Sequence, residues 1–295
     1  SFINAQGFGK IGMLTVVIGA VLNIILDPIF IFVLDMGVKG AAIATIISQF
    51  VSSVWIMMFL CGKKTILRLQ VRNFRLHRRR VSKIVTLGFS GFIMAITNSA
   101  VQIVSNTSLQ FYGGDLYVGI MTVINSIREI ITLPVTGFTN ATQPVISYNY
   151  GARAYDRVRT SIKFMSVVCV LYTFIAWLIL NIFPEFFIKI FNRNPELIKN
   201  ALSSLRIYFL GFFMMPLQFA GQSTFVALGK SKQAIFFSLL RKVIIVIPLT
   251  ILLPKMFGLG INGVFLAEPI SNIIGGIACY ATMIATVRPE LKNQI

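Results

Sequence analysis

The chain contains one octapeptide twice in altered form, as Gly37-Val38-Lys39-Gly40-Ala41-Ala42-Ile43-Ala44 and again as Gly260-Ile261-Asn262-Gly263-Val264-Phe265-Leu266-Ala267. The match resumes a few residues further on, where Ile47-Ser48-Gln49 aligns with Ile270-Ser271-Asn272. Before these stretches, two blocks also correspond, because each begins with Gly-Lys and ends in Pro, at residues 9–28 and 229–248. The sequence therefore predicts an internal repeat.

The repeated stretches are apolar, and so is most of the chain. Mean hydropathy is +0.81 and only 12% of the residues are charged, whereas charged residues make up roughly a quarter of a soluble domain. The apolar runs are long enough to cross a hydrocarbon core about 30 Å thick. We predict an all-α, polytopic transmembrane bundle of about eight helices, near residues 11–34, 40–60, 84–110, 116–147, 160–182, 200–228, 235–257 and 260–286.

The positive charge predicts how these helices are oriented. Of the 27 Lys and Arg residues, 20 lie in alternate segments, namely the N-terminal stretch and residues 61–83, 148–163, 229–242 and 287–295. The positive-inside rule places these segments in the cytoplasm. The densest of them, 61–83, contains His77, and we interpret it as a solvated loop rather than a nucleic-acid or phosphoinositide site. We expect no nucleic-acid partner.

The repeat also predicts the domain organisation. Its two copies run in the same direction across the membrane, so the repeat is parallel, and duplicated bundles are typical of transporters. We expect residues 1–60 to be the last two helices of an N-terminal lobe and 61–83 to be an interlobe loop. Residues 84–295 would then form a complete six-helix C-terminal lobe. Two lobes of six helices would place four more helices upstream of residue 1.

The sequence has few of the residues and motifs that catalysis or metal binding requires. It has one histidine and three cysteines, and the cysteines lie in or beside apolar runs without metal-binding spacing. No Gly-rich loop of the GxxxxGK[ST] type occurs. We therefore expect neither an enzyme nor a cofactor.

Polar residues inside apolar spans need an explanation, because a charge at the bilayer centre costs on the order of 3 kcal/mol. The fourth predicted span carries a polar stripe within an arc of roughly 80°, formed by Asn125, Glu129, Thr132, Thr136, Asn140 and Gln143. Arg128 lies at its edge. The stripe favours a water-lined wall that contacts an ion or substrate; the alternative is a structural ion pair of Arg128 with Glu129 or with another helix.

Three further spans contain candidate residues. In the first, Asn23 and Asp27 share a helix face before Pro28, which favours a cation site or, equally, an ion pair with a neighbouring helix or Lys39. The third span has an amide side chain at every fourth residue, at Asn98, Gln102, Asn106 and Gln110. This spacing is compatible with two roles, lining a cavity or forming hydrogen bonds between helices. Glu268 precedes Pro269 in the last span, where the other repeat has Thr45.

The same stretches resemble the multidrug and toxic compound extrusion (MATE) family. The resemblance rests on residues 19–30 and 37–45, on Gln143-Pro144-Val145-Ile146-Ser147-Tyr148-Asn149-Tyr150-Gly151-Ala152, and on Ala227-Leu228-Gly229-Lys230-Ser231 followed by Arg241 and Ile247-Pro248-Leu249. It implies two lobes around a central cavity and efflux of cationic or amphipathic compounds by alternating access. Such a protein is a multi-pass monomer of the bacterial inner membrane, in contact with lipid and drug-like small molecules.

The resemblance leaves the coupling ion open between H+ and Na+. Members of one branch use carboxylates in the seventh and tenth helices, where this chain has only amides such as Asn98 and Gln218. One alternative function is a flippase for lipids or lipid-linked oligosaccharides, which predicts a strongly cationic cavity. Once the basic residues of the connecting segments are set aside, only Arg128 and Arg206 remain within the spans, so the sequence favours the efflux antiporter. A second rival, a membrane enzyme, would need clustered His, Asp or Glu near one interface.

Overall fold

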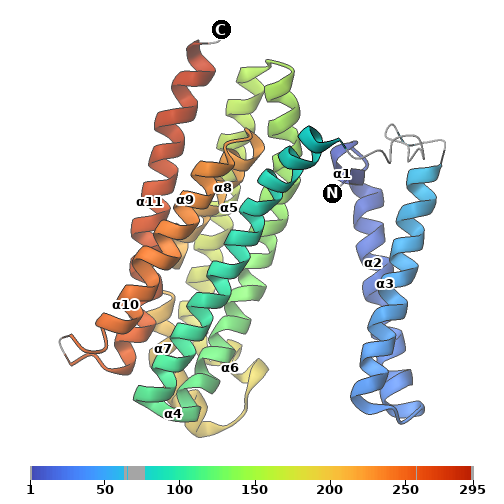
Figure 1. Cartoon of the computed structure of the whole chain (residues 1–295). Helices are drawn as coiled ribbons and strands as arrows, with labels where there is room; N and C mark the ends of the chain where they lie inside the picture. The colour runs from blue at the N-terminus through green and yellow to red at the C-terminus, as the bar shows by residue number, and fades with distance from the viewer. Residues whose placement is uncertain (1, 63–64, 66–76, 257, 294–295) are drawn as a thin grey trace. The chain divides into compact units, whose positions relative to one another are not determined.

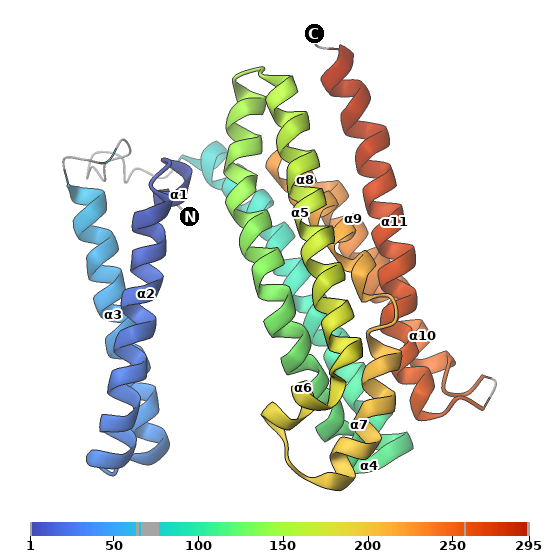
Figure 2. The ribbon, with the colours of Figure 1, turned by 180° about the vertical axis from the view of Figure 1, so that it is seen from behind.

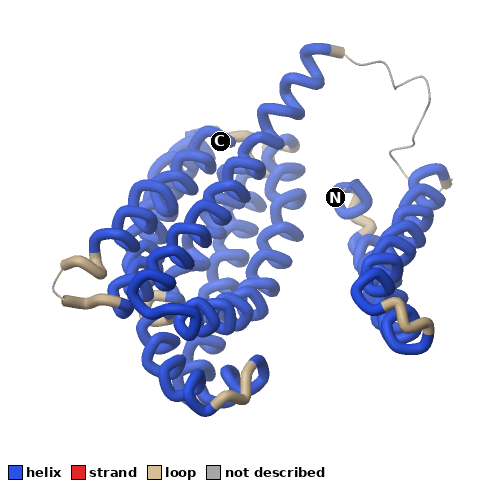
Figure 3. The backbone as a smooth tube through the Cα atoms, turned by 60° about the horizontal axis from the view of Figure 1, so that its bottom comes forward, coloured by secondary structure: helices blue, strands red, loops and turns tan. Residues whose placement is uncertain are grey.

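The computed structural model describes residues 2–62, 65, 77–256 and 258–293. Every regular element in this part of the chain is a helix, as the blue tube of Figure 3 shows. The prediction of an all-α fold is therefore confirmed. The helices form two compact units, Ser1–Arg78 and Arg79–Ile295, which are described separately. Most of the basic loop predicted at 61–83 lies outside the described residues.

The first unit is a pair of antiparallel helices. After the short α1 (Phe2–Ala5), α2 (Gly9–Pro28) continues into the π-helical turn η1 (Ile29–Val33), and the chain returns as α3 (Gly37–Cys61) (Figure 1). Pro28 stands where α2 widens into η1, because proline has no amide hydrogen for the regular α-helical ladder. Small residues let the helices approach closely: Ser52 donates a hydrogen bond to the Thr15 carbonyl at 3.2 Å.

The second unit contains a longer set of helices. They are α4 (Arg78–Gly151), α5 (Tyr155–Ile182), α6 (Pro184–Phe191), α7 (Pro195–Tyr208), η3 (Phe212–Met214), α8 (Met215–Ala227), α9 (Ser231–Leu239), η4 (Leu240–Val246), α10 (Ile247–Leu252) and α11 (Ile261–Asn293). Helix α8 packs against both α5 and α11 (Figure 2), and α11 also packs against η4 and α10. A lobe with α8 at its centre results.

Helix α4 contains two of the predicted spans, 84–110 and 116–147. The break between them is Gly114, whose φ of 67° and ψ of −167° are not helical. Glycine adopts positive φ without the steric cost that a side chain imposes. The two predicted spans are therefore joined at a single non-helical residue, where the chain changes direction, rather than by the longer connection 111–115 that lies between their predicted ends.

The predicted span at 200–228 is not a single straight helix. It divides into α7 and the segment of η3 and α8, which meet at an angle of 43°. At the break, a Cβ atom on Gly211 would lie 2.6 Å from the Pro269 carbonyl oxygen of α11, so only glycine allows this approach. The indole of Trp177 donates a hydrogen bond to the Phe209 carbonyl at 2.8 Å. The same carbonyl also accepts the backbone N–H of Phe212 at 3.1 Å, so two donors hold it at the bend.

These helices account for the predicted membrane spans. Six of them, within the described residues, are long and apolar enough to cross a membrane, and the bent pair adds a seventh. Because α4 holds two of the predicted spans, one on either side of Gly114, these elements correspond to the eight predicted spans. Large apolar side chains on the outer surface are exposed, for example Val38, Phe111 and Phe32 at 89%, 82% and 78%. Such a surface is suited to lipid rather than water.

The repeat seen in the sequence is also a repeat of packing. A Cβ atom on Gly40 would lie 2.5 Å from the Phe30 carbonyl oxygen, and one on Gly263 would lie 2.6 Å from the Leu253 carbonyl carbon. In both units the contacted backbone lies ten residues before the glycine. The two glycines therefore hold equivalent helix ends together, as their matching sequences predict.

Candidate functional site

The second unit encloses a polar cavity of about 510 Å³. Its walls come from α4, α8, η4 and α11, with smaller contributions from α7 and α10. The residues singled out in the sequence that line it include Gln102, Asn125, Arg128, Glu129, Gln218 and Glu268. The structure brings these six together from three different helices.

The polar stripe of α4 forms one wall of this cavity. Asn125, Glu129, Thr132 and Thr136 line it, so their helical spacing places them on one face as predicted. Two further predicted members, Asn140 and Gln143, are not among the lining residues. In the first half of α4, Asn98 and Gln102 line the cavity whereas Asn106 does not, because amides spaced by four residues drift around a helix of 3.6 residues per turn.

Arg241 organises the interior of the cavity. Its side chain is only 6% exposed. Nη1 donates hydrogen bonds to Gln218 Oε1 at 3.1 Å and Asn272 Oδ1 at 2.8 Å, and Nη2 donates to Glu268 Oε1 at 2.9 Å. A buried charge is tolerated when it is paired and hydrogen-bonded in this way. The guanidinium thus ties η4 to α8 and α11.

Glu268 is shared between two arginines. The Oε1 atom that accepts the bond from Arg241 also lies 4.0 Å from Arg128 Nη1. Arg128 Nε is buried and has no hydrogen-bond partner. The ion pair of Arg128 is therefore formed across helices with Glu268, and the alternative pair with Glu129 is not observed. Glu129 is exposed and forms no ion pair within the described residues.

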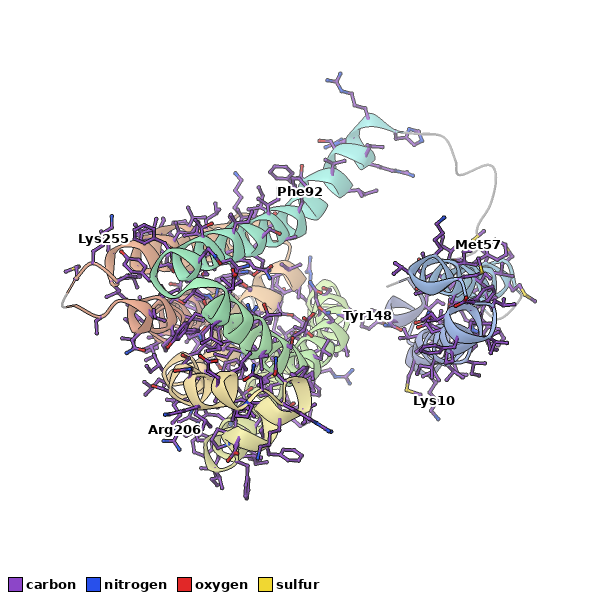
Figure 4. All side chains as sticks on the ribbon, turned by 90° about the horizontal axis from the view of Figure 1, so that it is seen from below. Lys10, Met57, Phe92, Tyr148, Arg206 and Lys255 are labelled. Carbon is purple, nitrogen blue, oxygen red and sulfur yellow. The ribbon has the colours of Figure 1, made fainter. Side chains whose placement is uncertain are left out.

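Arg241 and Lys242 were placed wrongly by the sequence reasoning, which counted them in the cytoplasmic segment 229–242. Both lie on η4 and line the cavity, and Lys242 Nζ donates a hydrogen bond to Asn98 Oδ1. The interior cations are therefore Arg128, Arg241 and Lys242, not Arg128 and Arg206. Arg206 is exposed on the outer side of the lobe (Figure 4). The signal that pointed to Arg241 was Glu268, an acid in the adjacent span that needed a partner.

A second polar site lies in the first unit, between α2 and α3. Asn23 Nδ2 donates hydrogen bonds to Asp27 Oδ1 at 3.1 Å and to Thr45 Oγ1 at 3.4 Å. Asn23 and Asp27 do share a face, as their spacing predicts. The alternative pair of Asp27 with Lys39 is absent, and within the described part of the chain no cationic side chain pairs with Asp27. The carboxylate accepts a hydrogen bond from the Asn23 amide, which also donates to the Thr45 hydroxyl.

The duplicated, apolar helices and the charged internal cavity are those of a multi-pass membrane protein with the repeated organisation that is typical of transporter folds. The MatE family model matches residues 91–252, more than half of the chain. The chain belongs to the MATE family, as the motifs of the sequence indicated.

Known relatives agree with this assignment. The multidrug export protein MepA of Staphylococcus saprophyticus is 26% identical over 260 residues, which are 88% of this chain and 56% of MepA. An outward-facing multidrug resistance MATE transporter of the MOP superfamily has a TM-score of 0.91 at 23% identity, covering 99% of this chain and 64% of its own. A MOP superfamily transporter from Pyrococcus furiosus, described as having a binding pocket of reversed polarity that suggests a different function, has a TM-score of 0.90 at 23% identity. It covers 98% of this chain and 64% of its own. The chain spans about half the length of the curated relatives it matches.

Proposed function

We propose that this protein is a cation-coupled multidrug efflux antiporter that exports cationic or amphipathic compounds by alternating access. The observation that carries the proposal is the 510 Å³ cavity, whose lining combines apolar side chains with the carboxylate of Glu129, which forms no ion pair within the described residues. A pocket of this size and mixed lining suits a drug-sized amphipathic molecule. Membership of the MATE family and the similarity to MepA support the same function. The protein would act as a transporter, not an enzyme, and as a monomer in the bacterial cytoplasmic membrane.

Coupling requires an acid that exchanges a cation during the cycle. Asp27 and Glu129 have no cationic partner among the described residues, whereas Glu268 is already neutralised by Arg241. Asp27, Asn23 and Thr45 together offer a carboxylate, an amide and a hydroxyl, and hard cations such as Na+ prefer oxygen ligands of this kind. We therefore assign ion coupling, by H+ or Na+, to the Asp27 site and substrate contact to Glu129.

The test compares Glu129→Gln with Asp27→Asn in proteoliposomes that take up a cationic dye under an imposed pH or Na+ gradient. Both substitutions keep size and hydrogen bonding while they remove a charge. We expect Asp27→Asn to abolish gradient-driven transport and Glu129→Gln to weaken dye binding. Normal transport per folded molecule in both variants would contradict the proposal. The gradient that drives the wild type identifies the ion.

One observation favours a second function, a flippase for lipids or lipid-linked compounds. The cavity contains the three cations Arg128, Arg241 and Lys242, a feature that suits a phosphate headgroup. Accelerated translocation of a fluorescent phosphatidylglycerol in proteoliposomes, without any ion gradient, would favour the flippase.

A further inference from the structure

The cavity of the second unit contains more cationic than anionic groups. Arg128, Arg241 and Lys242 line it together with two carboxylates, those of Glu129 and Glu268. Of these carboxylates, Glu268 is bound by Arg241 and is only 10% exposed in its side chain. Besides Arg241, the lining contains two more cations: Arg128, whose Nη1 atom lies 4.0 Å from the same Glu268 Oε1 atom, and Lys242, which pairs with no carboxylate among the described residues.

Hydrogen-bond donors in the same region also exceed their acceptors. Arg128 Nε, Arg241 Nε and Asn272 Nδ2 are buried without a partner. Leaving a buried donor unsatisfied costs about 1–3 kcal/mol, although these three nitrogen atoms have almost no accessible surface and are not themselves contacts for a ligand in the cavity. The shortage is therefore one of acceptor oxygens, beside an excess of positive charge.

We propose that Arg128 and Lys242 bind a singly charged oxyanion, a carboxylate or phosphate, carried by an amphipathic substrate. The inference rests on the proposed transport function and specifies its substrate class. A guanidinium matches a carboxylate or phosphate with two parallel hydrogen bonds, and an ammonium adds a point charge. Met121, Met215 and Phe219 in the same lining provide adaptable apolar contacts for the body of the ligand.

Arg241 is a positioning residue in this arrangement. It holds Glu268 Oε1 at 2.9 Å, whereas Arg128 lies 4.0 Å from the same atom. The stem of Arg241 passes over Gly275, where a Cβ atom would lie 2.8 Å from Arg241 Cγ. Because Arg241 satisfies the buried acid, the guanidinium of Arg128 keeps donors available to the cavity.

The test uses rhodamine 110 and its methyl ester, rhodamine 123, which share one cationic ring system and differ in a free carboxylate. Binding to the purified protein in phosphatidylcholine nanodiscs is followed by fluorescence anisotropy. We expect the free acid to bind about tenfold more tightly than the ester, equivalent to one charge-assisted contact. Arg128→Gln should remove this preference, weakening the acid and strengthening the ester, whose ring cation Arg128 repels.

Two further variants complete the experiment. Lys242→Gln should reduce the preference for the free acid as well, and it replaces Arg128→Gln as the test if that variant does not fold. Among the described residues, the Lys242 ammonium donates a hydrogen bond to the amide of Asn98. Lys255→Gln removes the same charge from the exposed connector between α10 and α11 (Figure 4) and should leave the preference at its wild-type value.

The outcomes separate this inference from the proposed function. Equal affinity for the two dyes in the wild type, or an unchanged preference in both cavity variants, would overturn the inference even if rhodamine 123 is exported. Failure to bind or export either dye would instead count against the transport function. Adding phosphatidylglycerol distinguishes the source of the oxyanion: if it abolishes the preference, a lipid headgroup occupies the site, and if not, the oxyanion belongs to a free amphipathic compound.

Discussion

Thr45 and Glu268 occupy the same position in the two copies of the repeat, but their surroundings differ in kind. Thr45 accepts a bond from Asn23, which also binds the carboxylate of Asp27. Glu268 is bound by Arg241 at 2.9 Å and lies 4.0 Å from Arg128. One copy thus has an acid that pairs with no cation in the described part of the chain, and the other has an acid held by two cations.

The difference shows how the two copies of a duplicated fold come to hold acids with different roles, one able to bind a cation and one fixed in an ion pair. An acid without a counter-charge changes its charge state or binds a cation without breaking an existing ion pair. An acid between buried guanidiniums is fixed, because removing its charge leaves those cations uncompensated. The packing at Gly40 and Gly263 remained equivalent while the chemistry beside it diverged.

The largest expected effect is that of Glu268→Gln. Removing this charge leaves Arg241 buried without a carboxylate, and breaking a buried pair costs about 3–5 kcal/mol. We expect a clear fall in folded yield and in the unfolding temperature measured in detergent. The control is Glu185→Gln, since Glu185 pairs with Lys189 at 2.7 Å on the exposed surface of α6, where such pairs contribute about 0–1 kcal/mol. If Glu268→Gln and Glu185→Gln lowered the unfolding temperature equally, Glu268 would not be a fixed structural acid, and the contrast with Asp27 in the other repeat would be lost.

The next largest effect is expected at Gly40 and Gly263, the two glycines whose close helix packing is common to both copies of the repeat. Gly40→Ala and Gly263→Ala should each destabilise the protein by about 1–3 kcal/mol, because the added Cβ atom meets backbone that has little room to move. Gly137→Ala adds a methyl group where nothing lies within 4 Å and should be neutral or slightly stabilising. Thermal unfolding of the three variants measures this, and a loss at only one of the two repeat positions would show that the copies pack differently.

A smaller effect is expected at Asn23. Asn23→Ala removes the donor that contacts both Asp27 and Thr45, which should lower the free energy of unfolding by about 1 kcal/mol. Thr45→Val removes only the longer contact at 3.4 Å and should cost less. If Thr45→Val proves more harmful than Asn23→Ala, the amide is not the centre of this site.

The smallest effect on stability is expected for Asp27→Asn, which retains an oxygen for the bond from Asn23. The change in the free energy of unfolding should stay within about 0.5 kcal/mol, even though transport is lost. Comparing this variant with Glu268→Gln by the same detergent unfolding assay gives the sharpest contrast between the two acids. A destabilisation as large as that of Glu268→Gln would show that Asp27 also has a structural partner.

Much of this arrangement follows from local sequence, because helical spacing is a local property. The stripe from Asn125 to Thr136 reaches the cavity wall as predicted, and Asn23 contacts Asp27 one turn away. The stripe stops at the end of the cavity, so Asn140 and Gln143 fall outside it. That limit depends on the neighbouring helices.

Arg241 and Lys242 show where sequence reasoning failed. A basic pair at the start of an apolar run is typical of a cytoplasmic loop. The acid that accepts the bond from Arg241 lies 27 residues further along the chain, and the contact forms only when η4 and α11 pack. The bend at Gly211 was missed for the same reason, because the Pro269 carbonyl that excludes a side chain belongs to another helix.

The bond between Arg241 and Glu268 also bears on how the ribosome delivers this lobe to the membrane. Residues Ser231–Leu252 leave the ribosome before their counter-charge exists, and translation at about 5–20 residues per second delays Glu268 by about 1–5 s. During that time an arginine alone in lipid would cost on the order of 3 kcal/mol. The segment from α9 to α10 is therefore expected to wait beside the insertion channel and to enter the bilayer as a hairpin with α11.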